Sequence, residues 1–248
     1  MIKNVLVVGL GHVGTAIYEL LEDNPNYLVQ DKDVADKQIF LPIDIMHICF
    51  PYTDKFAETA EQYMTQFKPR LTIIESTVLP KTTQKIYAKT QMPICHSPVR
   101  GREDLKKELL RYTKFIGSPK REWAFEAEKY YNSLGIKTLI CSSPLETEFM
   151  KLLNTTYYAL MITFFQEIRR ICNKHEVNEA EIKTFFQTNT IESGLQHIRP
   201  ILYPGIIGGY CLLPNLELLR QIHPSALFDA ILISNEKMKQ SEISNEQF

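Results

Sequence analysis

The sequence predicts an α/β protein in which a doubly wound parallel sheet is followed by a helical domain built on one long central helix. Two observations support this fold class. Short apolar runs alternate with helical stretches as far as residue 141, an order that is typical of a parallel sheet with helices on both faces. From Ser143 to Lys174, apolar residues then recur at helical spacing without a break. We therefore expect two domains, residues 1–142 and residues 143–248.

The composition is that of an ordinary globular protein and excludes several classes of partner. Of 248 residues, 44% are hydrophobic and 23% are charged, and a chain of this length can bury a full core. The formal net charge of −1 gives no general attraction to nucleic acid or to an anionic membrane. No apolar run is long enough to span a membrane, and we expect no signal peptide. The five cysteines have no C-x-x-C spacing, which predicts a reduced, cytoplasmic protein.

A glycine motif follows the first predicted strand, Lys3–Val8, and precedes a predicted helix, Thr15–Leu21. In this G-x-G-x-x-G pattern the glycines allow a tight turn, close approach of the backbone to a pyrophosphate, and close packing of the helix on the strand. The helix N-terminus adds N–H groups and a positive dipole. The pattern predicts a Rossmann-type dinucleotide-binding domain whose cofactor contacts are Gly9, Leu10, Gly11, His12, Val13 and Gly14.

An acidic residue ends the second predicted strand, Tyr27–Asp31. Asp31 lies about 20 residues after the glycines, where a carboxylate accepts a hydrogen bond from the ribose of a dinucleotide. A carboxylate at this position repels a 2′-phosphate, so we predict NAD rather than NADP as the cofactor. Asp33 is the alternative candidate for this role.

The alternation continues through five more predicted strands. They span residues 44–51, 70–77, 92–98, 113–116 and 137–141, and helices are expected at 54–67, 82–90 and 119–134. Such sheets bind ligands at the carboxyl ends of their strands. We therefore expect the loops 50–53, 76–80 and 97–102 to line the cofactor cleft, with contacts from Phe50, Pro51, Ser76 and Thr77.

The predicted long helix begins with a capping box, in which Ser143 is the N-cap, Pro144 is the first helical residue and Glu146 lies three residues after the cap. At 1.5 Å per residue the helix is about 45 Å long, longer than a small domain is wide. It should bridge two lobes or be covered by a second subunit, and we predict a homodimer through residues 143–174. We expect further helices at 178–188, 216–222 and 224–238, a glycine-rich turn at 205–214, and a frayed tail at 239–248.

Four segments together resemble the UDP-glucose/GDP-mannose dehydrogenase family. VLVVGLGHVGTAI resembles its NAD-binding start, and the ESTVLPKTT segment from Glu75 to Thr83 resembles its ESTV-P-G-TT loop. Residues 146–172 resemble its long central helix, with a lysine and an F-x-x-E segment. Gly208-Gly209-Tyr210-Cys211 resembles the G-G-x-C turn that carries the catalytic cysteine. The order and spacing also match, so the resemblance covers nearly the whole chain.

The resemblance implies a two-step oxidation of a small-molecule substrate, the primary alcohol of a sugar nucleotide, to a carboxylate, with two NAD reduced. Cys211 would add to the intermediate aldehyde, and Lys151 would stabilise the developing oxyanion. Thr77 would help to position water or the nicotinamide. Asn154, one turn along the helix from Lys151, is a further catalytic candidate. Family members also carry a C-terminal domain that closes over the nucleotide sugar, and we expect this chain to lack it.

Four positions depart from the family pattern: Thr155 replaces an asparagine, Asn215 an acid, Pro214 a lysine that is often present, and Val99 a glutamate. Two alternative functions therefore stay open. A lysine on the long helix near an amide also resembles the β-hydroxyacid dehydrogenases, which transfer one hydride and need no cysteine. The other alternative is a non-catalytic NAD-binding protein that acts as a sensor or as a partner in an assembly.

The other chemically reactive residues are most simply explained by packing. Cys49, Cys95 and Cys141 lie in apolar strands, and Cys172 continues the apolar stripe of the long helix. His96, at the end of a predicted strand, is a candidate for substrate contact. We find no H-E-x-x-H or other metal-ligand spacing and expect no bound metal.

Overall fold

The structure is a computed structural model that describes residues 2–31, 39–101, 103–209 and 211–245. The chain divides into two compact units, Met1–Lys151 and Leu152–Phe248. Within the described residues, no helix combines the length and the hydropathy that crossing a bilayer requires. The first unit contains the strands, and the second is helical.

The first unit is built on a five-stranded parallel sheet. Its strands, in the spatial order β2-β1-β3-β4-β5, are β1 (Lys3–Val8), β2 (Tyr27–Asp31), β3 (Ile45–Ile48), β4 (Leu71–Ile74) and β5 (Ile94–His96). The chain leaves β1 toward one edge to form β2 and then returns to the other side of β1 to form β3. This reversal makes the sheet doubly wound and puts its switch point between the carboxyl ends of β1 and β3. The predicted sheet is thereby confirmed.

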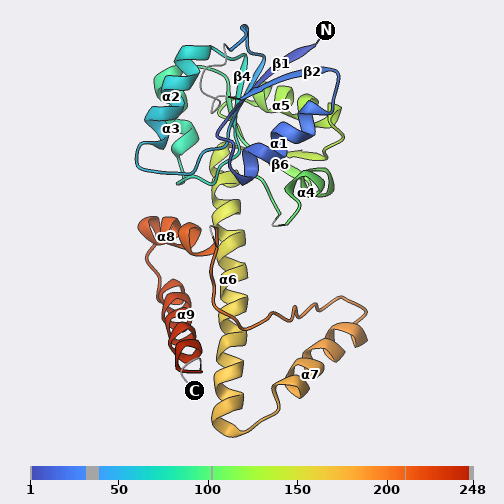
Figure 1. Ribbon diagram of the computed structural model, residues 1–248, viewed down its shortest axis with the longest axis vertical. Coiled ribbons are helices and arrows are strands. Elements are labelled where there is room, and N and C mark those ends of the chain that lie inside the picture. The colour runs from blue at the N-terminus through green and yellow to red at the C-terminus, as the bar shows by residue number, and fades with distance from the viewer. Residues whose placement is uncertain (1, 32–38, 102, 210, 246–248) are drawn as a thin grey trace. The chain divides into compact units, whose positions relative to one another are not determined.

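Helices cover both faces of this sheet (Figure 1), with α2 and α3 on one face and α1 and α5 on the other. The helices of this unit are α1 (His12–Glu22), α2 (Phe56–Phe67), α3 (Thr82–Thr90), α4 (Leu105–Arg111) and α5 (Arg121–Ser133). Successive residues of a strand point to opposite faces. Val5 and Val7 therefore join the core under α1 and α5, whereas Leu6 and Val8 join the core under α2 and α3.

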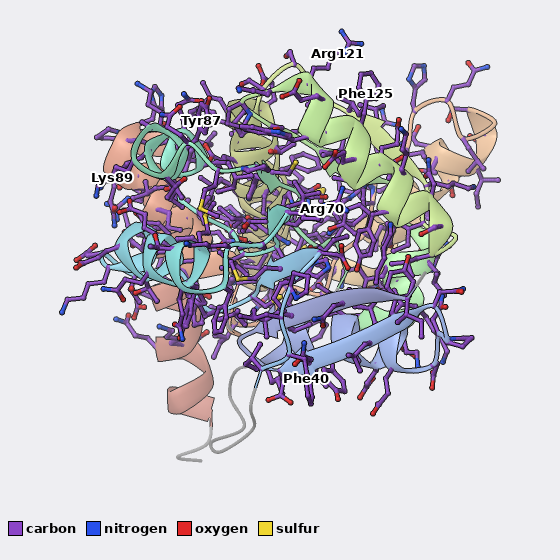
Figure 2. All side chains as sticks on the ribbon, turned by 90° about the horizontal axis from the view of Figure 1, so that it is seen from above. Phe40, Arg70, Tyr87, Lys89, Arg121 and Phe125 are labelled. Carbon is purple, nitrogen blue, oxygen red and sulfur yellow. The ribbon has the colours of Figure 1, made fainter. Side chains whose placement is uncertain are left out.

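The outer surfaces of the two helical layers carry charged side chains, beside an exposed Phe125 on α5. In Figure 2, Lys89 of α3 points outward at the left of the first unit and Arg121 of α5 points outward at its top. The inner surfaces are apolar. Tyr87 of α3 packs against the cores of both faces and meets Trp123 of α5 edge to face, with ring centroids 5.3 Å apart. This amphipathic division is what a helix on a sheet requires.

Two further strands form a separate ladder. β6 (Lys114–Ile116) and β7 (Thr138–Ile140) pair in parallel, and a single antiparallel bridge joins His96 to Gly117. Gly117 also lies against the start of α6 (Pro144–His175), because a Cβ on Gly117 would stand 2.6 Å from Cα of Pro144. Only glycine allows this approach of helix and strand.

The long helix α6 has the predicted bounds to within one residue at each end. At its start, the Ser143 hydroxyl accepts a hydrogen bond from the Leu145 N–H at 3.1 Å and donates one to the Glu146 carboxylate at 2.6 Å. The predicted cap residues are therefore in place, although Glu146 bonds the Ser143 side chain. Residues of α6 up to Lys151 belong to the first unit, and the rest belong to the second.

The second unit packs three more helices with the remainder of α6. They are α7 (Glu179–Glu192), α8 (Leu212–Ile222) and α9 (Ala226–Asn245). Phe165, Ile168 and Cys172 form a buried cluster on α6, against which Ile182, Phe186 and Leu202 pack. The prediction of a frayed tail at residues 239–248 is wrong for residues 239–245, because α9 continues to Asn245 despite the polar sequence. The described parts of the chain thus combine an α/β unit with a helical one.

Candidate cofactor-binding and active site

The glycine motif lies at the switch point of the sheet, where its shape requires glycine at two positions. Gly9 has φ +98°, and a Cβ on it would stand 2.7 Å from the backbone nitrogen of Phe50. A Cβ on Gly14 would overlap the carbonyl oxygen of Gly9. The loop after β1 therefore packs directly on the loop after β3 and on the first turn of α1.

The N-terminus of α1 has the properties of a phosphate-binding turn. Gly11 is the N-cap, with extended backbone and no side-chain hydrogen bond to the helix, and a Cβ on it would meet nothing within 4 Å. His12 begins the helix and is exposed. Because the first turn of a helix has N–H groups without partners in that helix, this open end fits the pyrophosphate of a dinucleotide.

Asp31 lies at the end of β2, beside β1 and 4% exposed. The register pairs it with Val7, two residues before the glycine motif begins. This is the edge of the sheet at which the glycine turn also lies, as a ribose-binding carboxylate requires. Asp33, the alternative, falls outside the described residues.

The carboxyl ends of β3 and β4 are joined by a side chain. The Ser76 hydroxyl donates a hydrogen bond to the Phe50 carbonyl at 2.6 Å. The Phe50 ring packs on Phe56, with centroids 4.7 Å apart, whereas Pro51 is exposed. Thr77 follows Ser76 and is half-buried. The predicted contacts Phe50, Pro51, Ser76 and Thr77 thus gather on two loops at one edge of the sheet.

A buried ionic cluster lies under these loops, and the sequence analysis did not predict it. Glu75, 1% exposed, accepts hydrogen bonds from Lys114, from the Tyr131 hydroxyl at 2.5 Å and from Nδ1 of His47 at 2.9 Å. Lys114 also donates to the Ser97 carbonyl at 2.6 Å. The cluster therefore ties the ends of β4 and β5 to β3, β6 and α5.

The negative charge of Glu75 is paired with the positive charge of Lys114. Burial alone would raise the pKa of Glu75, but the Lys114 ammonium and the hydrogen bond from His47 outweigh it and lower the pKa to about 2. Burial raises the pKa of Tyr131 well above its ordinary value, so its hydroxyl remains a donor. The sequence does contain a sign of this cluster, because His47 and Lys114 are polar residues in otherwise apolar strands. It does not identify Glu75 as their common partner.

His96 holds β5, β4 and α6 together. Its Nε2 lies 3.1 Å from the Ser76 carbonyl oxygen and its Nδ1 lies 2.8 Å from the Thr147 hydroxyl. Burial lowers the pKa of His96 to about 4, so the ring is neutral, donates from Nε2 and accepts at Nδ1. The prediction that His96 contacts substrate is wrong, because the residue is 0% exposed and both of its nitrogens are bonded.

The first turns of α6 supply two more polar groups to the first unit. Glu148 is buried and accepts hydrogen bonds from the backbone N–H of Lys81 at 2.6 Å and of Thr83 at 2.9 Å, which caps α3. Lys151, half-buried, donates to the Val99 carbonyl at 2.7 Å. The ammonium predicted to be catalytic is therefore held beside the chain that leaves β5.

Cys211 lies in the second unit, as the N-cap of α8, and is exposed. Its carbonyl accepts a hydrogen bond from the backbone N–H of Asn215 at 3.1 Å. The Asn215 side chain is buried and donates to the Thr155 hydroxyl at 3.2 Å. Two of the positions that depart from the family pattern are thus in contact, whereas Asn154 is exposed on α6.

Among the five cysteines, all of which lie in the described residues, Cys211 alone is exposed. Cys49, Cys95 and Cys172 are buried and Cys141 is half-buried, as the packing interpretation expected. Burial raises the pKa of Cys95 to about 12, which makes it a poor nucleophile. Over the described ranges, histidine, cysteine and acidic side chains form no group of three that could hold a metal ion.

The sequence matches a known family over the region that follows the sheet. Residues 145–238 match the model of the UDP-glucose/GDP-mannose dehydrogenase family, central domain. Among curated proteins, the chain is 31% identical over 149 residues to a UDP-N-acetyl-D-mannosamine dehydrogenase of Methanococcus vannielii. That alignment covers 57% of this chain and 33% of the relative, so the chain spans about a third of the length of the enzyme it matches. The resemblance predicted from the sequence is confirmed.

Solved structures show the same fold. The UDP-D-ManNAc dehydrogenase of Pyrococcus horikoshii superposes with a TM-score of 0.78 at 20% identity, covering 95% of this chain and 69% of that one. The 3-hydroxyisobutyrate dehydrogenase of Mycobacterium tuberculosis superposes with a TM-score of 0.71 at 16% identity, covering 95% of this chain and 94% of that one. Both are dehydrogenases in which a Rossmann-type sheet is combined with a helical domain.

Proposed function

We propose that the chain, whose residues 145–238 match the central-domain model of the UDP-glucose/GDP-mannose dehydrogenase family, is an NAD-dependent oxidoreductase of the nucleotide-sugar 6-dehydrogenase type. The substrate class is the primary alcohol of a sugar nucleotide. Residues 1–142 would be the NAD-binding domain, and residues 143–248 the helical domain. The cytoplasm is the proposed compartment, because all five cysteines are free thiols.

The observation that carries the proposal is the glycine turn at the switch point of the sheet, in a chain whose next region matches a dehydrogenase family. Gly9 and Gly14 are sterically required there, and the open N-cap at Gly11 leaves room for a pyrophosphate. Asp31 would accept a hydrogen bond from the ribose, and Ser76 and Thr77 would line the same edge. These residues fit NAD, whose role when bound is to accept one hydride in each oxidation.

The residues of this chain would carry the other steps. The Cys211 thiolate would add to the carbon of the intermediate aldehyde, and the Lys151 ammonium would stabilise the negative charge on its oxygen. Oxidation of this adduct leaves a thioester on Cys211. Water then adds to the thioester carbonyl, the C–S bond breaks, and the carboxylate leaves with the thiol restored. Thr77 would position that water or the edge of the cofactor.

The test is NADH formation with NAD and a panel of UDP- and GDP-sugars, comparing wild type with Cys211→Ser. We expect two NADH per acid formed by the wild type, and a variant that cannot complete the second oxidation. Cys172→Ser is the matched control, because Cys172 is buried in the helical core and should leave turnover unchanged. NAD binding without NADH formation from any alcohol would contradict the proposal.

A second candidate is single hydride transfer of the β-hydroxyacid dehydrogenase type. One observation favours it: this chain and the Mycobacterium tuberculosis enzyme have the same fold over 95% and 94% of their lengths. Lys151 would then be the catalytic residue and Cys211 would have no role. Lys151→Ala should abolish turnover of a β-hydroxyacid, and Cys211→Ser should not. For oxidation of a sugar nucleotide, in contrast, Cys211→Ser should prevent the second oxidation.

The third candidate is a non-catalytic NAD-binding protein that serves as a sensor or an assembly partner. Its support is the pair Thr155 and Asn215, two neutral residues where the family pattern has an amide and an acid. Tight NAD binding together with a Cys211 thiol no more reactive than a free cysteine would favour it. Formation of a covalent aldehyde adduct on Cys211 would exclude it.

We further propose a homodimer through α6. Apolar side chains at Leu153, Tyr157, Phe164 and Ile171 are 50–58% exposed and repeat at a spacing of four and then seven residues. A heptad repeat of exposed apolar residues is the pattern of a helix that packs against another helix. A second copy of the chain supplies an identical stripe, which a twofold axis makes self-complementary.

The test is the mass in solution by light scattering over a range of concentrations. Wild type should be dimeric, and Tyr157→Glu/Phe164→Glu should be monomeric with unchanged helix content. Phe185→Glu is the matched control, because Phe185 on α7 is 67% exposed but lies outside the stripe. A wild type that stays monomeric at high concentration would refute the dimer.

A further inference from the structure

The segment that leads to Cys211 has no secondary structure of its own. Residues 195–210 include neither helix nor strand where the structure describes them, yet Ile207 in this segment is only 2% exposed. A buried peptide group needs partners for both its N–H and its C=O. A side chain must supply these partners, because no neighbouring strand does so.

Asn235 of α9 supplies both partners at once. Its Oδ1 accepts a hydrogen bond from the Ile207 N–H at 2.6 Å, and its Nδ2 donates one to the Ile207 carbonyl at 3.0 Å. Asn235 is 1% exposed, so the pair is shielded from water. Two residues earlier, the Gly205 carbonyl accepts a hydrogen bond from Nε2 of Gln166 at 2.7 Å. The chain before Cys211 is therefore fixed at Ile207.

Asn215 fixes the chain on the other side of Cys211. It is 5% exposed, and its side chain donates to the Thr155 hydroxyl on α6. Its backbone N–H bonds the Cys211 carbonyl. An amide has no titratable proton near neutral pH, so Asn215 is suited to hold the first turn of α8 and unsuited to transfer a proton.

Between these two anchors lies a short span, residues 208–211, of which the described residues are exposed. Gly208 and Gly209 are both exposed, and Gly209 has φ +80°, a conformation that glycine adopts without strain. Cys211 is the exposed end of this span. We infer that Asn235 and Asn215 are positioning residues that hold the Cys211 turn at its two ends. This inference rests on the proposed function of Cys211 as the nucleophile.

The experiment compares Asn235→Ala with wild type by hydrogen–deuterium exchange and by steady-state kinetics. Exchange in residues 205–211 should be about tenfold faster in the variant, because the buried Ile207 N–H loses its acceptor. The kcat for NADH formation should fall by at least about tenfold. The KM for NAD should not change, because the glycine turn belongs to the other unit. Asn235→Asp keeps the acceptor and loses the donor, so its effects should be intermediate.

Thr163→Val is the matched control, because Thr163 is buried on α6 but bonds only the Ala159 carbonyl of its own helix. It should leave exchange at 205–211 and kcat unchanged. If Asn235→Ala does not fold, Asn235→Asp and Asn215→Ala provide the test instead. Asn215→Ala should increase hydrogen exchange in the first turn of α8 and lower kcat.

Unchanged exchange at 205–211, or an equal increase throughout α8 and α9, would overturn the inference, since anchoring predicts a local effect. A normal kcat in a variant with faster local exchange would also overturn it. Failure of the proposed function gives a different result. In that case Cys211→Ser keeps full turnover, while Asn235→Ala still shows the local change in exchange.

Discussion

Replacing Glu75 by glutamine should strongly destabilise the first unit. The substitution keeps the size of the side chain and removes its negative charge. Lys114, 3% exposed, would then be a buried ammonium facing a neutral amide. Breaking one side of a buried ion pair costs about 3–5 kcal/mol, because the remaining charge stays buried without compensation.

The pKa of Glu75 gives a second estimate of how much its charge contributes to the stability of the first unit. The difference between its ordinary value of 4.5 and about 2 in the folded protein corresponds to about 3 kcal/mol of stability at neutral pH. Because the folded pKa is the lower one, this stability is complete above about pH 5 and is lost as the pH falls toward 2. Wild type should therefore lose about 3 kcal/mol over that interval through Glu75, and Glu75→Gln should not show this component.

The assay is urea unfolding followed by the fluorescence of Trp123. It is the single tryptophan of the chain and is 8% exposed on α5, so it reports on the first unit. Glu22→Gln, at the exposed end of α1, is the control for loss of a surface charge. Glu75→Gln/Lys114→Met should lie closer to wild type than Glu75→Gln does, because no buried charge is left unpaired.

Two results would refute this reasoning. One is a Glu75→Gln variant as stable at pH 7 as wild type and the Glu22→Gln control. The other is a variant whose stability falls between pH 5 and pH 2 as steeply as that of wild type. Either result would mean that the cluster is not held by charge.

Three further predictions concern the glycine motif, Lys81 and Asp31. Gly14→Ala should lower stability and prevent NAD binding, because its Cβ would overlap the Gly9 carbonyl oxygen. Gly11→Ala should fold normally, because its Cβ would lie in open space, but its affinity for NAD, measured by calorimetry, should fall at least about tenfold. Lys81→Gly should stabilise the first unit by about 1 kcal/mol in urea unfolding, because Lys81 has φ +76°, whereas Lys85→Gly inside α3 should destabilise it by a similar amount. Asp31→Asn should reduce the preference for NAD over NADP by about tenfold, and equal affinities in the wild type would contradict the assignment of Asp31.

Much of the fold follows from local pattern, since strands and long helices leave a periodic record in the sequence. The β-branched runs predicted β1 to β5, and the apolar stripe predicted α6 to within one residue at each end. The short helix α4 was missed, because its buried residues are only Leu105 and Leu109, too few to establish a period. The length of α9 was underestimated, because its last two turns carry few apolar residues.

The candidate site was predictable where it depends on spacing, and unpredictable where it depends on long-range contacts. The glycine motif requires particular residues within six positions, so it is visible in the sequence. Glu75, His47, Lys114 and Tyr131 lie up to 84 residues apart and meet only in the folded sheet, so no local pattern joins them. The contact between Thr155 and Asn215 is of the same kind.

The continuity of α6 has a consequence for how the chain can be divided and for how it folds during synthesis. A shortened chain that stops at residue 142 would contain every strand that the structure describes but would lack Thr147 and Glu148. His96 Nδ1 would lose its donor, and the first N–H groups of α3 would lose their acceptor. Residues as far as Glu148 must therefore leave the ribosome before the α/β unit can form these hydrogen bonds. A stable fragment for cofactor studies should end after Lys151, within a helix.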